Sequence, residues 1–83
     1  MWYAVTRYEV TYNNSIVRAG SIYQVRRDRK DNIVAVPMEG ASAIKCGKFV
    51  LSQGQARDMF TKPTKSFNDA VEESIMQCEA NYC

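Results

Sequence analysis

Apolar and polar residues alternate along the first part of the chain. From Trp2 to Tyr12 the even positions are Trp, Ala, Thr, Tyr, Val and Tyr, and the odd positions from 7 onward are Arg, Glu and Thr. A period of two is typical of a β-strand with one buried face. The pattern therefore predicts one long strand over residues 2–12, with the even positions buried. Asn13, Asn14 and Ser15 supply turn-forming residues that end it.

Three further strands are predicted, over residues 21–27, 32–37 and 43–51. Pro37 ends the second of these because proline cannot donate to a β-ladder. Gly47 interrupts the third and indicates a bulge or bend. Between the first two lies a highly charged turn, so these strands are expected to form a hairpin with a charged tip.

The spacing of apolar residues changes after residue 52. Residues 53–60 lack β-branched side chains and predict a short helical segment. Residues 66–81 predict an amphipathic helix with the Ser66 hydroxyl as its N-cap. An apolar stripe at helical spacing is expected to cover an open face of the sheet. This stripe consists of Phe67, Val71, Ile75, Cys78 and Tyr82.

These elements predict a single α+β domain over residues 1–83. Because no helix connects consecutive strands, the sheet should be antiparallel. The expected architecture is a sheet of four to five strands, or a small barrel, with a C-terminal helix. The segments GSIYQV, NIVAV and IKCGKFVLS, within residues 16–52, resemble an SH3-like small barrel of the kind found in ribosome-associated and phage-encoded proteins.

Charge is distributed unevenly along the chain. The net charge is only +2, but all eleven basic residues and five of the nine acidic ones lie in residues 1–65, which therefore carry +6. Residues 66–83 carry the other four acids and no basic residue, a net −4. This separation predicts two surfaces of opposite sign, and bears on partners rather than on fold.

The residue types argue against an enzyme. The chain has no histidine, the commonest general base and metal ligand. Its three cysteines, Cys46, Cys78 and Cys83, lack the Cys-x-x-Cys spacing of a zinc site, and no glycine-rich phosphate loop is present. We therefore expect no catalytic residue, no cofactor and no metal.

The chain shows no sign of membrane targeting. Its apolar runs are too short to cross a bilayer, and its first residues lack the pattern of a signal peptide. We expect no membrane partner and a cytoplasmic location, which is the host cytoplasm if the protein is phage-encoded.

The expected function is therefore that of a non-catalytic binding protein. A protein is the partner expected first, ahead of nucleic acid. The acidic face of the C-terminal helix would meet a basic groove that normally holds nucleic acid. In style the short chain resembles bacteriophage accessory proteins that inhibit host restriction, CRISPR or transcription machinery. The residues expected to contact the partner are Asp69, Glu72, Glu73 and Glu79.

The alternative is a nucleic-acid-binding SH3-like barrel that uses the basic hairpin at residues 26–30. Asp28 and Asp31 lie within the same cluster and cancel half of its charge. The hairpin tip is therefore also consistent with an exposed, solvated turn that binds no partner. A homodimer through the edge of the first strand, with Trp2, Tyr3 and Tyr8, is a third alternative. The residues expected to contact nucleic acid are Arg18, Tyr23, Arg26, Arg27, Arg29 and Lys30.

Overall fold

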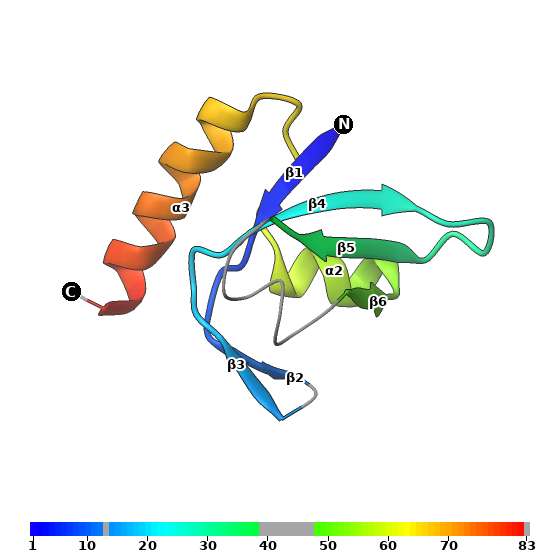
Figure 1. Cartoon of the computed structure of the whole chain (residues 1–83), viewed down its shortest axis with the longest axis horizontal. Coiled ribbons are helices and arrows are strands. Elements are labelled where there is room, and N and C mark those ends of the chain that lie inside the picture. Colours follow the sequence, from blue (N-terminus) through cyan, green and yellow to red (C-terminus); the bar gives the residue numbers. More distant parts are fainter. Residues whose placement is uncertain (13, 39–47, 83) are drawn as a thin grey trace.

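A computed structural model gives the fold, and it describes residues 1–12, 14–38 and 48–82. It is α+β as expected, with an antiparallel four-stranded sheet, a small two-stranded sheet and a C-terminal helix (Figure 1). The elements are β1 (Trp2–Val5), β2 (Val10–Tyr12), β3 (Ser15–Val17), β4 (Ile22–Arg27), β5 (Ile33–Pro37), β6 (Phe49–Leu51), α2 (Gln53–Met59) and α3 (Phe67–Tyr82).

The main sheet has the strand order β1-β4-β5-β6. Its register places Trp2 opposite Val25, Val25 opposite Ala35, and Ala35 opposite Phe49. Directly paired residues point to the same side of a sheet, so this row marks the inner face. The core on that face is built around the rings of Tyr23, Phe49 and Phe60, whose centroids lie 5.3–6.2 Å apart.

The prediction of one long strand over residues 2–12 is wrong. The chain leaves the main sheet at Thr6, and β2 pairs with β3 in a separate hairpin that turns at Asn14, whose φ is 61°. The break follows from the fully buried Thr6, whose Oγ1 donates to the carbonyl of Arg18 and accepts from the amide of Ser21. The expected even face is accordingly only partly buried.

The outer edge of β1 is not free, which removes the edge on which a homodimer was expected. The amide of Tyr3 donates to the carbonyl of Thr64 and the reverse bond is also made, both at 2.8 Å. The amide of Thr61 donates to the carbonyl of Val5 at 2.8 Å. Residues 60–64 therefore extend the sheet beyond β1 and occupy the groups that a second copy would need.

The other predicted strands and the short helix agree with the structure within the described residues. The strands predicted over 21–27 and 32–37 correspond to β4 and β5. Of the strand predicted over 43–51, β6 covers Phe49–Leu51, and residues 43–47, with Gly47 and Cys46, lie outside the described residues. The helical segment predicted over 53–60 is α2, which begins with a capping box between Ser52 and Gln55.

The C-terminal helix is present, but its apolar stripe does not cover the sheet. Ser66 caps α3 as predicted, accepting from the amide of Asp69. However, Ala70 is the only buried residue described in α3, and Phe67, Ile75 and Tyr82 are 44–54% exposed. The stripe prediction is therefore wrong about which face is buried.

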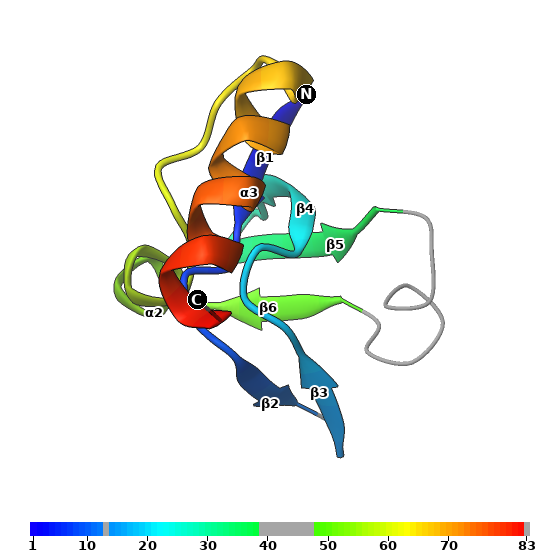
Figure 2. The ribbon, with the colours of Figure 1, turned by 90° about the vertical axis from the view of Figure 1, so that its left-hand side faces the viewer.

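Polar contacts decide how α3 sits. Figure 2 shows α3 running alongside β1, and hydrogen bonds fasten its second half to the chain between β1 and β4. Ser74 Oγ donates to the carbonyl of Gly20, and Tyr82 Oη accepts from the amide of Ala19 at 3.2 Å. Asn81 donates to the carbonyl of Arg7 at 3.0 Å. Ser74 and Asn81, two turns apart, share a side of α3 next to the apolar stripe, and of the stripe only Tyr82 joins these bonds, so the stripe is turned partly toward solvent.

None of the helices among the described residues combines the length and apolar character needed to cross a membrane.

Two glycine substitutions test this packing. At Gly20 (φ 87°) a Cβ would lie 2.7 Å from the carbonyl oxygen of Ser74. We expect Gly20→Ala to lower the free energy of unfolding by about 2 kcal/mol or more, because left-handed backbone costs alanine roughly 1–2 kcal/mol before any overlap. The matched control Gly54→Ala, with open space in α2, should raise stability by up to about 1 kcal/mol. Urea unfolding measures both, and equal effects would contradict the packing described.

Candidate cationic groove

A recess lies on the inner face of the main sheet, beside α2. β1 begins at Trp2, opposite Val25, whereas β4 continues to Arg27, so the end of β4 is paired with β5 but has no partner among the described residues on its β1 side. The resulting groove has a volume of about 770 Å³. Its apolar floor consists of Ala4, Val25, Ile33, Ala56 and Phe60.

The described residues that line this groove include four cations and no acid. Arg27 pairs in register with Ile33 and shares the face of Val25, so its side chain belongs to the inner face. Arg26 lies at the margin, because successive side chains of a strand point to opposite faces. Arg57 on α2 and Lys62 in the following segment complete the set. The groove is therefore a positively charged recess with an apolar floor.

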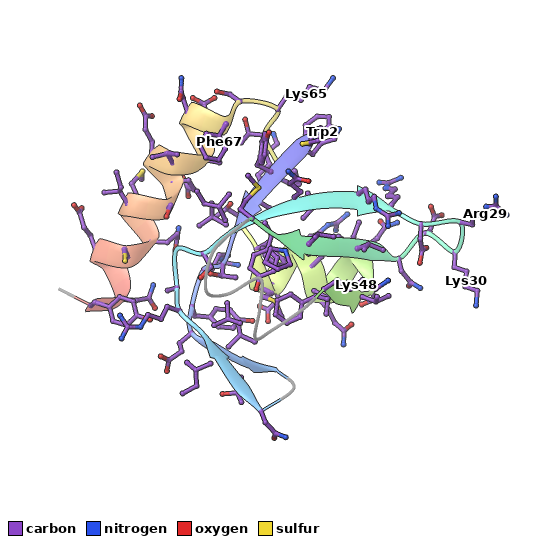
Figure 3. All side chains as sticks on the ribbon, in the orientation of Figure 1. Trp2, Arg29, Lys30, Lys48, Lys65 and Phe67 are labelled. Carbon is purple, nitrogen blue, oxygen red and sulfur yellow. The ribbon has the colours of Figure 1, made fainter. Side chains whose placement is uncertain are left out.

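Trp2 forms one wall of the groove. Its side chain is 45% exposed, although it lies in the same row of the sheet as the buried Ala35. The Nζ of Lys65 lies 4.9 Å from the centroid of the indole ring, a cation–π contact that Figure 3 shows at the start of β1. Trp2 lines the groove and Lys65 does not.

Contacts outside the groove hold α2 in place. A guanidinium nitrogen of Arg7 donates to the carbonyls of Arg57 and Asp58 at the end of the helix, at 3.4 and 3.3 Å. The Tyr8 hydroxyl donates to Asp58 Oδ2 at 2.9 Å. That hydrogen bond to the carboxylate is the main reason why the pKa of Tyr8 is raised above 10.0. Asp58 thus faces Tyr8 and does not line the groove, which leaves the charge of Arg57 unopposed there.

The predicted basic hairpin divides into two parts. Arg26 and Arg27 reach the groove, whereas Arg29 and Lys30 project outward from the tip (Figure 3). Asp28 has a structural role, because its Oδ1 accepts from the amides of Lys30 at 2.8 Å and Asn32 at 2.9 Å. The sequence had suggested that this carboxylate merely cancels charge, but it shapes the turn that presents the tip.

The two remaining residues of the predicted nucleic-acid site lie elsewhere. The ring of Tyr23 is completely buried in the core, so it has no exposed face on which a base could stack. Arg18 is exposed but precedes β4, whereas Arg29 follows it. A six-residue strand is about 20 Å long, so Arg18 is not part of one cluster with the tip.

The predicted acidic surface is largely exposed on α3. Asp69, Glu72 and Glu79 are exposed, while Glu73 is half-buried and accepts from the side-chain amide of Gln77. The structure adds two apolar residues that sequence reasoning did not place on this surface. Ile75 and Met76 are 54% and 59% exposed, and residues at 72, 75, 76 and 79 share one face of a helix.

Sequence reasoning missed much of the groove. Trp2 was assigned to a buried strand face, and the cations of Arg57, Lys62 and Lys65 were counted only in the total charge. One feature of the sequence could have indicated a basic surface here, because residues 59–68 contain two lysines and no acidic residue. Nothing local connects that segment with Trp2, since the two meet only because residues 60–64 pair with β1.

Comparisons with known proteins found no matching family model, curated protein or solved structure. Among the described residues, no three histidine, cysteine or acidic side chains gather to form a metal site.

The turn at the hairpin tip can be tested through Asp28. We expect Asp28→Ala to lower the free energy of unfolding by about 1–2 kcal/mol, because two backbone amides lose an ionised acceptor. The control Asp28→Asn retains an acceptor oxygen and should lose clearly less. Thermal unfolding of the three proteins measures this, and equal losses for both substitutions would show that the hydrogen bonds do not stabilise the turn.

Proposed function

We propose that this chain is a non-catalytic binding protein that holds nucleic acid in the cationic groove. The observation that carries the proposal is the lining of the groove, where four cations and no acid surround an apolar floor and an indole ring. Phosphates bind to arginine and lysine, and bases stack on aromatic rings.

The arrangement of charge outside the groove supports the same proposal. Arg29 and Lys30 at the hairpin tip follow Arg26 and Arg27 along the chain, so a bound strand that leaves the groove has further cations within reach. The acidic helix α3 lies at the opposite end of the long axis from this tip (Figure 1). Its carboxylates are thus kept away from the hairpin cations.

The order of the strands supports the resemblance to an SH3-like small barrel. With residues 60–64 beside β1, the order is segment 60–64, β1, β4, β5 and β6. Here β1, β4, β5 and β6 form an antiparallel meander, and the segment that follows α2 returns to lie beside β1. The cytoplasmic location expected from the sequence is also part of the proposal.

The test compares two charge reversals on a labelled single-stranded oligonucleotide. Wild-type protein should bind with an affinity that falls with salt, the slope of log K against log [salt] being roughly −3 for four neutralised phosphates. Arg27→Glu, in the groove, should weaken binding about tenfold or more. Fluorescence anisotropy at two salt concentrations gives both quantities.

Arg18→Glu is the matched control, because Arg18 is exposed like Arg27 but lies at the other end of β4. We expect it to change affinity less than threefold. Similar losses from the two reversals, or no salt-dependent binding by the wild-type protein, would overturn the assignment of the groove.

A second candidate, the protein partner expected from the sequence, is favoured by the exposed face of α3. Ile75 and Met76 are both more than half exposed between Glu72 and Glu79. Apolar side chains flanked by acidic residues are complementary to a basic partner surface with an apolar centre. Such a protein would act as an inhibitor, in the style of phage accessory proteins, by covering a surface that otherwise receives phosphates.

Two paired variants test this candidate. Ile75→Glu with Met76→Glu replaces two side chains that are more than half exposed and leaves Ser74, Asn81 and Tyr82 unchanged, so the fold should be retained. Proteins captured from extract of the producing cells should be lost with this variant and retained with Arg27→Glu. If both variants capture the same proteins as the wild type, the face of α3 is not a docking surface.

A further inference from the structure

We propose that the groove receives an unpaired base stacked on the indole ring of Trp2, so that its ligand is a single strand and not a duplex. This inference rests on the proposed function, because it names the class of nucleic acid that the same groove would take. Three features of the groove lead to it.

The first feature is the position of the indole ring. Trp2 stands on the inner face of the sheet, in register with Val25, and is the only tryptophan in the chain. Lys65 covers part of the ring from outside the groove, at 4.9 Å from the centroid. This contact favours one orientation of the ring, which also lines the groove. A fixed aromatic surface loses little conformational entropy when a base stacks on it.

The second feature is the apolar floor. Ala4, Val25 and Ile33 offer no polar side-chain atom to a phosphate or a sugar, whereas a base stacked on Trp2 can pack against them. In a duplex the bases are stacked on one another, and only their edges and the sugar-phosphate backbone are accessible. A recess of about 770 Å³ is within the roughly 300–1,000 Å³ typical of small-ligand sites, too small for a double helix.

The third feature is that the cations lining the groove come from separate parts of the chain. Arg27 comes from the end of β4, while Arg57 and Lys62 come from α2 and the segment after it. A nucleotide in a strand has a phosphate on either side of its base. The groove therefore offers several cations, from three parts of the chain, to the phosphates that flank a base stacked on Trp2. A free anion would need only one of these cations.

The experiment uses the emission of Trp2, which reports on the groove without a label. The full chain is titrated with a single-stranded oligothymidylate, with a strand of the same length and charge that lacks bases, and with a duplex of mixed sequence. We expect the oligothymidylate to quench the emission and to bind about tenfold or more tightly than the abasic strand, given the usual contribution of one stacked base. The abasic strand and the duplex should leave the emission nearly unchanged.

Two substitutions separate stacking from charge. Trp2→Ala should weaken binding of the oligothymidylate about tenfold and leave binding of the abasic strand within twofold, as measured with labelled strands. Trp2→Phe keeps an aromatic face and should retain most of the affinity. Circular dichroism verifies that each variant is folded, and Trp2→Phe serves as the test if Trp2→Ala is not.

The outcomes that overturn this inference differ from those that overturn the proposed function. If the abasic strand or the duplex binds as tightly as the oligothymidylate, the groove binds polyanions and no base enters it, while the proposed function stands. If no nucleic acid binds in a salt-dependent manner, both fail. If an acidic peptide with aromatic residues, used as a competitor, binds the groove in preference to every strand, the ligand is a protein segment and both fail.

Discussion

The hydrogen bonds of Thr6 hold the parts of this molecule together. Its hydroxyl bridges the carbonyl of Arg18 and the amide of Ser21, and its backbone bonds to Ser21 and Gly20. One buried residue thereby ends β1, sends the chain into the β2–β3 hairpin and closes the loop where that hairpin returns. The same loop presents the carbonyl of Gly20 to Ser74. The packing of α3 against the sheet therefore also depends on the bonds of Thr6. In an 83-residue chain with a small core, polar bonds of this kind stabilise an arrangement that apolar area alone would leave loose.

The groove lies at the other end of β1 from this break. β1 begins at Trp2, opposite Val25, so Arg26 and Arg27 have no strand partner in the described part of the chain on the β1 side of β4, and the inner face is open there. Residues 60–64 occupy the outer side of β1 and carry Lys62 to the mouth of the opening. The cations thus come from β4, from α2 and from the segment after it, and no local stretch of sequence contains the site.

The elements predicted correctly are those in which the local pattern and the tertiary environment agree. β4, β5 and the C-terminal helix were predicted because alternation or helical spacing continues through each of them. The break in the first strand was not predicted, since Thr6 fits the strand pattern. Only its hydrogen bonds to Arg18 and Ser21 end β1 at this residue. The buried face of α3 was not predicted either, because small and polar residues such as Ala70 and Ser74 make its contacts. The periodicity argument considered only the larger apolar side chains. The acidic surface of α3 was expected from the charge of the sequence. Trp2, Arg57 and Lys62, by contrast, come together only through pairing between distant segments.

The separation of charge along the chain becomes a separation in space once α3 and the hairpin tip are placed. They lie at opposite ends of the longest dimension, which is 38 Å (Figure 1). In the field of a polyanion the cations of the tip are attracted and the carboxylates of α3 are repelled, which favours orientations with the tip forward. In such an orientation the exposed side chains of α3 face away from the polyanion.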